Sequence, residues 1–183
     1  MGFRFLIVCG GTGGHLAPGI AVAEELLGRG HRCSLVISRK EVDSRLVRKY
    51  GHLDFVRLPG AAFGKSPREA GRFFSGLAGG LAAGRRILRR ERPDVVLAFG
   101  GFLSLGIVLF AAWNRLPIAL HEANRRPGRA VRMLGRFADR VYLPPGVRLS
   151  SVPEGAVRCY GYPVRREFRR MSRRAAREKL GLN

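Results

Sequence analysis

Two glycine-rich turns in the sequence are typical of sites that hold an anion. The segment GGTGGH, Gly10 to His15, lies between an apolar strand-like run and a helical segment, and FGGFLS places Gly100 and Gly101 in an equivalent position. Glycines let the backbone approach an anion closely, and the start of the following helix offers unpaired N–H groups with partial positive charge. One such pair alone would indicate tight packing. Two at the same edge of a parallel sheet favour a diphosphate in one crevice.

Side chains beside these turns add donors, acceptors and a base. Thr12 adds a hydroxyl, and His15 follows directly on the first turn. Imidazoles titrate near neutrality and can remove a proton from a sugar hydroxyl. In the segment HEAN, His121 is a second candidate imidazole, Glu122 could orient an imidazole or bind a hydroxyl, and Asn124 offers both a donor and an acceptor. The spacing does not decide which residue is the base.

Other nucleotide-binding motifs fit less well. Leu16 stands where the third glycine of a dinucleotide-binding GxGxxG would fall, and the second strand ends in Arg39 and Lys40 instead of an acidic residue for a ribose. NAD binding is therefore disfavoured. Residues 60–66, GAAFGKS, are one residue short of a P-loop and are interpreted as a flexible loop.

Strands and helices alternate along the chain, which predicts a Rossmann-like α/β fold, a parallel sheet with helices on both faces. The uncharged run 95–113 approaches the length of a membrane span, but its glycine pair favours a strand, a turn and a buried helix. The expected strands are 3–9, 32–38, 54–58, 94–99, 117–121, 140–143 and 156–160, and the expected helices are 17–27, 41–50, 67–90, 103–113, 129–137 and one capped by Ser172.

The chain is strongly basic. Its 183 residues carry 34 Lys and Arg, 30 of them Arg, against 13 Asp and Glu, for a net charge of +21. A field of this sign attracts nucleic acid, acidic lipid or phosphorylated substrates, although a GC-rich genome would also raise the Arg content. No zinc-finger, RNP or helix-turn-helix pattern is present, so specific nucleic-acid binding ranks low.

The cysteines indicate neither a disulfide framework nor a zinc site. Cys9, Cys33 and Cys159 are odd in number and far apart, which fits a reducing cytoplasm. The apolar run 5–9 is too short for the core of a signal peptide, so we expect no export signal.

Five segments, taken in order, resemble the amino-terminal half of the MurG family: GGTGGHLAPGIAVAEEL, PDVVLAFGGFLS, PIALHEAN, RFADRV and GYPVRREF. This family transfers N-acetylglucosamine from its UDP-sugar to undecaprenyl-diphosphate-linked muramyl pentapeptide. The resemblance implies one half of a two-domain GT-B glycosyltransferase. It also implies inverting, metal-independent transfer that uses no cofactor.

The resemblance further implies roles for individual residues. His15 is the candidate base for the muramyl 4-hydroxyl. The acceptor diphosphate would be surrounded by Gly11, Thr12, Gly13, Gly14, Gly100, Gly101 and Ser104, and the cleft would be lined by His121, Glu122, Asn124 and Arg165.

By the same resemblance, residues 1–163 form the acceptor domain, and residues 164–183 form a basic linker and helix leading to an absent donor domain. Without that domain the chain is expected to be inactive alone. It is then part of a longer enzyme, a subunit of a split transferase, or a binding remnant. Three positions differ from the family pattern: Tyr162 replaces the Asn of GNPVR, Ala123 a Gln, and Val131 an Asn.

Residues 68–92 combine seven arginines with apolar residues at helical spacing, which suits the surface of an anionic membrane. Packing against the sheet explains the same periodicity equally well, and the family's action at the cytoplasmic membrane face favours membrane contact. The expected contacts are Phe73, Phe74, Leu77, Leu81, Arg85 and Arg89.

Overall fold

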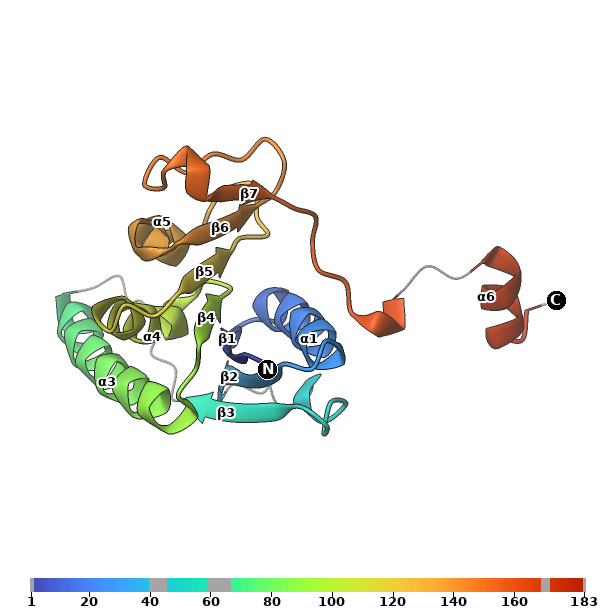
Figure 1. The fold of residues 1–183 in the computed structure, drawn as a ribbon, viewed down its shortest axis with the longest axis horizontal. Coiled ribbons are helices and arrows are strands. Elements are labelled where there is room, and N and C mark those ends of the chain that lie inside the picture. The colour runs from blue at the N-terminus through green and yellow to red at the C-terminus, as the bar shows by residue number, and fades with distance from the viewer. Residues whose placement is uncertain (1, 40–45, 59–66, 169–171, 183) are drawn as a thin grey trace.

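The fold is a seven-stranded parallel sheet in the order β3-β2-β1-β4-β5-β6-β7 (Figure 1). The computed structural model describes residues 2–39, 46–58, 67–168 and 172–182, and only the backbone of 67–78. The parallel strand order confirms the predicted Rossmann-like architecture. The strands are β1 (Arg4–Val8), β2 (Arg32–Ser38), β3 (Asp54–Leu58), β4 (Val95–Ala98), β5 (Ile118–His121), β6 (Arg140–Leu143) and β7 (Val157–Cys159).

Helices lie on both faces of the sheet. Figure 1 shows α3, α4 and α5 on one face and α1 on the other. The helices are α1 (Gly13–Gly28), α3 (Pro67–Glu91), α4 (Phe102–Trp113), α5 (Arg129–Leu134) and α6 (Arg173–Lys179), with 3-10 turns at Gly135–Phe137, Glu154–Ala156 and Arg166–Phe168. Of the expected helix 41–50, residues 41–45 lie outside the described residues, and of the rest Leu46 and Val47 are helical. The expected loop 60–66 also lies outside them.

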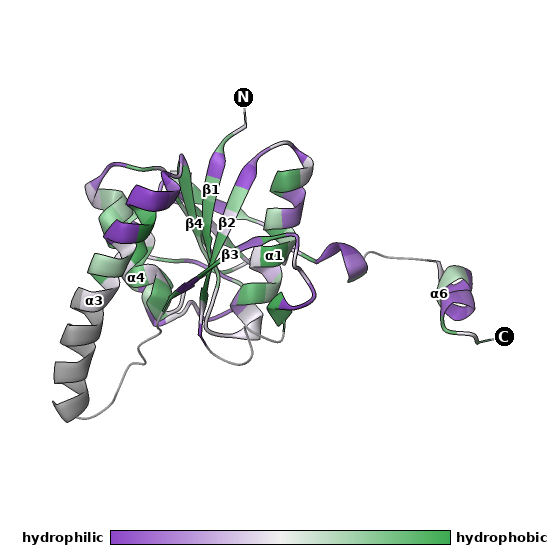
Figure 2. Cartoon of the chain, turned by 90° about the horizontal axis from the view of Figure 1, so that it is seen from below, coloured by the Kyte–Doolittle hydropathy of each residue, from purple (hydrophilic) through white to green (hydrophobic). Residues whose placement is uncertain are grey.

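Alternation along the strands divides the core into two clusters. In β1, Leu6 and Val8 face the cluster under α3, α4 and α5, whereas Ile7 faces the cluster under α1. Figure 2 shows these strands as hydrophobic between their covering helices. The uncharged run 95–113 forms β4 and the buried helix α4, as predicted. Within the described parts of the chain, every helix is too short or too polar to cross a bilayer.

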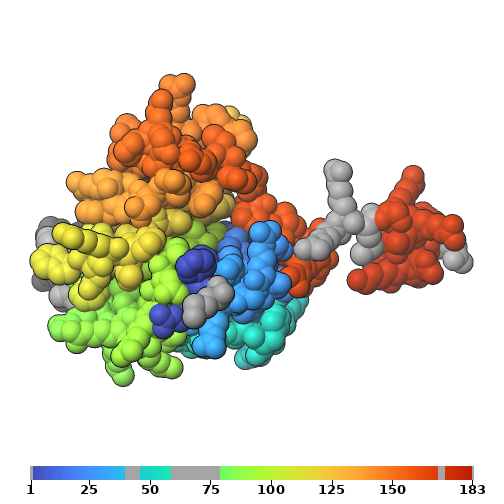
Figure 3. Space-filling view, in the orientation of Figure 1, coloured from blue at the N-terminus to red at the C-terminus, as the bar shows by residue number. Residues whose placement is uncertain are grey.

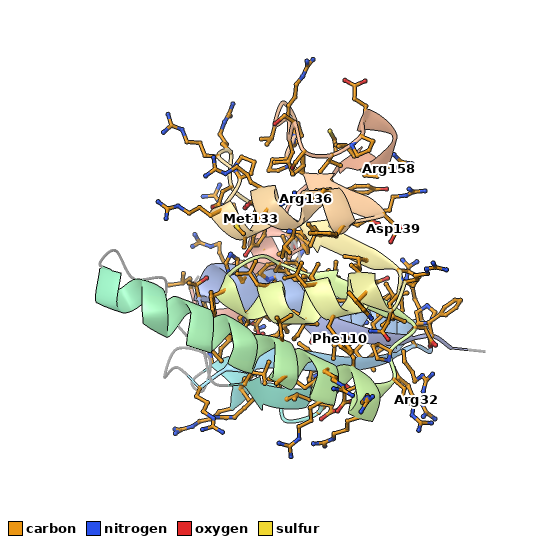
Figure 4. The ribbon with its side chains drawn as sticks, turned by 90° about the vertical axis from the view of Figure 1, so that its left-hand side faces the viewer. Arg32, Phe110, Met133, Arg136, Asp139 and Arg158 are labelled. Atoms are coloured by element: carbon orange, nitrogen blue, oxygen red, sulfur yellow. The ribbon has the colours of Figure 1, made fainter. Side chains whose placement is uncertain are left out.

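Glycines let α3 and α4 pack with their backbones in contact, side by side in Figure 4. A Cβ atom built on Gly106 would lie 2.3 Å from the carbonyl oxygen of Gly80, and one on Gly84 would lie 2.8 Å from the carbonyl oxygen of Gly106. Gly84 of α3 and Gly106 of α4 therefore serve helix packing.

The chain leaves the sheet through a strap, residues 160–168, that passes over α1 beyond β7 (Figure 3). Helix α6 then stands apart from the sheet and buries none of its residues. The hydroxyl of Ser172 accepts a hydrogen bond from the backbone N–H of Ala175, which confirms the predicted helix cap.

Candidate functional site

The first glycine turn is itself part of α1. The expectation that the loop extends through His15 and that the helix begins at Ala17 is wrong, because the helix begins at Gly13. The carbonyl of Thr12 accepts from the backbone N–H groups of His15 and Leu16, both at 3.1 Å. The missed start reflects the poor helix propensity of glycine, which tertiary context overrides here. His15 is consequently fixed on the first helical turn.

The second glycine turn has a conformation that favours glycine. Gly100 has φ of 86°, and Gly101, the N-cap of α4, has φ of 78° and ψ of 169°. The fully buried hydroxyl of Ser104 donates to the carbonyl of Gly100 at 2.6 Å. The Ser104 hydroxyl therefore stabilises the turn through this hydrogen bond. A contact of Ser104 with the acceptor stays a prediction.

The two turns meet at His15. A Cβ atom built on Gly101 would lie 3.5 Å from Nδ1 of His15 and 3.8 Å from the carbonyl oxygen of Gly10. One built on Gly100 would lie 3.9 Å from Nε2 of His15 and 3.1 Å from the Val131 side chain. The structure thus brings both predicted turns and the predicted base into one corner at the carboxyl end of β1 and β4.

His121 lies beside this corner as a buried imidazole. Its ring centroid is 5.0 Å from that of Phe99 and 6.5 Å from that of Tyr162. Burial lowers the pKa of His121, the Glu122 carboxylate opposes this shift, and the nearby His15 adds to it. His121 is therefore neutral at pH 7.

Glu122 folds the loop after β5. Its Oε1 accepts from the backbone and side-chain nitrogens of Asn124 at 2.8 and 2.7 Å, and its Oε2 accepts from the backbone N–H of Gly128 at 2.7 Å. The residue is 4% exposed. Both oxygens hold the loop in place, and the expected contacts of Glu122 and Asn124 with substrate stay predictions.

The strap is held on α1 at several points. The hydroxyl of Tyr162 donates to the carbonyl of Gly14 at 3.2 Å, and Arg166 donates to the carbonyl of Glu24 at 2.9 Å. Arg165 donates to the Tyr50 hydroxyl at 2.8 Å and pairs with Glu167 at 2.9 Å. Arg165 is thus engaged in holding the strap, and its predicted place in the cleft stays a prediction.

The other predicted positions are more exposed. Thr12 precedes α1 without a side-chain capping bond, and Gly11 has φ of 112°. Leu81 is half-buried, and Arg85 and Arg89 are exposed on α3. The side chains of Phe73, Phe74 and Leu77 lie outside the described residues. Among the side chains that are described, no group of three or more His, Cys, Asp or Glu could hold a metal ion.

An apolar groove of about 550 Å³ opens on the α1 face of the sheet. The groove is lined by Val22 and Leu26 of α1, by Leu97 of β4 and Phe99 directly after it, and by Tyr160 of the strap. His121 also lines this groove, so it lies between the groove and the glycine corner.

Comparison with known proteins identifies the family. The model of the glycosyltransferase family 28 N-terminal domain matches residues 5–143, from β1 to the end of β6. The chain belongs to glycosyltransferase family 28. The family 28 match includes both glycine turns, His15 and the segment after β5.

Two family 28 relatives have the same name, UDP-N-acetylglucosamine–N-acetylmuramyl-(pentapeptide) pyrophosphoryl-undecaprenol N-acetylglucosamine transferase. The relative from Opitutus terrae is 58% identical over 177 residues, which cover 97% of this chain and 47% of that protein. The relative from Geotalea uraniireducens is 38% identical over 90% of this chain and 46% of that protein. The chain therefore spans about half the length of the relatives it matches.

Solved structures share the fold. Acinetobacter baumannii MurG matches 82% of this chain and 44% of its own, with a TM-score of 0.66 and 22% identity. A UDP-N-acetylglucosamine 2-epimerase matches 88% of this chain and 49% of its own, with a TM-score of 0.68 and 15% identity. At these identities the likeness shows the fold alone.

Proposed function

We propose that this chain is the acceptor-binding half of an N-acetylglucosaminyltransferase. In this proposal, N-acetylglucosamine passes from UDP-N-acetylglucosamine to undecaprenyl-diphosphate-linked muramyl pentapeptide, the reaction named for its 58% identical relative. Residues 1–163 form the acceptor domain, and residues 164–183 lead toward a donor domain. The observation that carries the proposal is the corner where both glycine turns meet His15, since a Cβ atom built on Gly101 would lie 3.5 Å from Nδ1 of the imidazole.

Backbone groups at this corner suit a diphosphate. The first turn of α1 contains no acidic residue, and its N–H groups and helix dipole favour an anion. Gly13 and Gly14 leave that turn without side chains, and Gly100 and Gly101 do the same at the facing turn. The diphosphate therefore lies against backbone amides, with the sugar beyond it toward His15.

His15 is the general base in this proposal. As the acceptor hydroxyl oxygen bonds to the anomeric carbon, the bond from that carbon to the UDP oxygen breaks and UDP leaves with the electron pair. The imidazole of His15 takes the hydroxyl proton. Attack opposite to the leaving group inverts the anomeric configuration, and His121, which burial keeps neutral, adds no competing charge.

A second half supplies the UDP-sugar site. Parallel sheets are normally covered on both faces, and the apolar groove between α1 and the strap leaves Val95 of β4 and Ala119 of β5 partly exposed. Relatives about twice as long as this chain provide enough residues to cover it. We propose that the groove receives part of this second half.

The acceptor is a membrane lipid, so the domain acts at the cytoplasmic face of the membrane as a peripheral protein. Exposed Arg85 and Arg89 on α3, together with the 85% exposed Trp113 at the end of α4, support contact with anionic lipid. Arg136, in the 3-10 turn after α5, extends the basic surface on the side of the molecule seen in Figure 4, next to the exposed Met133 of α5.

Reconstitution of turnover tests the proposal. The chain is mixed with candidate donor-domain chains, UDP-N-acetylglucosamine and a synthetic lipid-linked muramyl acceptor, and UDP release is measured. Turnover that needs a partner and is lost in His15→Ala supports the transferase. Turnover unaffected by His15→Ala would contradict the assigned base. Lipid binding without turnover with any partner would indicate a binding remnant, and tight DNA binding without lipid binding would favour the nucleic-acid alternative.

A further inference from the structure

One carbonyl in the first turn of α1 has no hydrogen-bond donor at the usual position in the helix. In an α-helix the carbonyl of residue i accepts from the N–H of residue i+4. The residue four positions after Gly14 is Pro18, inside the helix, and proline has no N–H to donate. The Gly14 carbonyl, which belongs to the peptide unit joining Gly14 to His15, therefore has no N–H donor at the i+4 position of its own helix.

The strap supplies this donor. The hydroxyl of Tyr162, 148 residues away in the chain, donates to the Gly14 carbonyl at 3.2 Å. The tyrosine ring also meets the His121 ring edge-on, with an interplanar angle of 74°. Burial raises the pKa of Tyr162, a shift that Arg165 opposes, so the hydroxyl keeps the proton that it donates. One side chain thus touches both the glycine turn and the second histidine.

Tyr162 is itself held in place. The backbone on its carboxyl side is fixed by Arg165, which bonds to Tyr50, and by Arg166, which bonds to the carbonyl of Glu24 and lies against Gly28. These contacts hold the backbone of the strap beside α1, while Tyr162 itself is 48% exposed. The bond therefore has the support expected of a positioning contact.

We propose that Tyr162 is a positioning residue that replaces the helix donor missing at Pro18 and thereby holds the Gly14–His15 corner in its diphosphate-binding form. This inference rests on the proposed function, which it deepens. The strap then contributes to acceptor binding through Tyr162, in addition to connecting the sheet to the residues that follow it. The inference also implies that the effects of Tyr162 and Pro18 are coupled, since the Tyr162 hydroxyl compensates for the N–H that Pro18 lacks.

A double-mutant cycle on the 183-residue chain tests the pair. The variants are Tyr162→Phe, Pro18→Ala and the double variant, and Tyr160→Phe is the control, since it removes a hydroxyl from the same strap two residues away. The probe is farnesyl diphosphate, with its Kd measured by calorimetry. Loss of a neutral hydrogen bond predicts about fivefold weaker binding for Tyr162→Phe and unchanged binding for Tyr160→Phe. In the Pro18→Ala background, where the helix supplies its own N–H, Tyr162→Phe should have less than a twofold effect.

A second readout does not depend on the ligand. In NMR spectra of the unliganded chain, Tyr162→Phe should shift the His15 ring resonances and their titration midpoint, whereas Tyr160→Phe should leave both unchanged. Equal behaviour of the two single variants in both measurements would overturn the inference. An equal effect of Tyr162→Phe on binding in the wild-type and Pro18→Ala backgrounds would also overturn the inference. If wild type fails to bind the probe, the proposed function fails, and the His15 resonances still decide the role of Tyr162.

Discussion

Replacing Gly101 with alanine should destabilise the protein through backbone conformation. Alanine at Gly101 has room for its methyl group, because the nearest atom, Nδ1 of His15, would be 3.5 Å away, an ordinary contact. The backbone is the obstacle, since φ of 78° with ψ of 169° is a region occupied almost only by glycine. Such a conformation costs a non-glycine residue about 1–3 kcal/mol. We therefore expect the free energy of unfolding to fall by about 2 kcal/mol.

Urea unfolding measures this change, and Gly79→Ala is the matched control. Gly79 lies in α3 with open space around its Cβ position, so the same substitution there should raise the free energy of unfolding by up to about 1 kcal/mol. The midpoint for Gly101→Ala should drop while the slope m stays constant. A Gly101→Ala protein as stable as wild type would refute the assignment of a strained turn beside His15.

Three further predictions concern packing, charge and backbone strain. Gly106→Ala should lower the free energy of unfolding, measured in urea titrations, by about 1–3 kcal/mol, since its methyl group would clash with the carbonyl oxygen of Gly80 in α3. The pKa of His121 is lowered in the folded state, so the unfolded chain binds more protons and the free energy of unfolding should fall as pH drops below about 6.5. In His121→Leu, the free energy of unfolding from urea titrations should depend less steeply on pH. Arg115→Gly should raise the melting temperature, since φ of 54° costs arginine about 1 kcal/mol.

Much of the fold is readable from the sequence because buried parallel strands are short apolar runs. The bounds expected for β2, β3 and β6 agree with the structure, and those of the other strands differ by one residue at one or both ends. The start of α1 at Gly13 is not predictable from propensity, since Gly13 and Gly14 are poor helix formers. Close packing of α1 on the end of β1 is allowed by Gly19, where a built Cβ atom would lie 2.4 Å from Cβ of Cys9.

The candidate site was predictable in its turns and less so in its side-chain bonds. Two glycine turns after parallel strands must open at one edge, so their meeting at His15 follows from topology. The bonds of Glu122 depend on how the loop between β5 and α5, residues 122–128, closes, and no hydrophobic periodicity encodes this. Tyr162 was noted only as a departure from the family pattern, because its partner Gly14 is 148 residues away. The position of Pro18 four residues after Gly14 was the available signal.

The central claim, that the amides of two glycine turns hold one diphosphate, is tested most directly by amide NMR. The labelled chain is titrated with farnesyl diphosphate and, separately, with farnesyl monophosphate. We predict that the amides of Gly13, Gly14, Gly101 and His15 shift together along one binding curve, with tighter binding of the diphosphate. Shifts confined to the exposed arginines of α3 and α6, equal for both ligands, would contradict the claim.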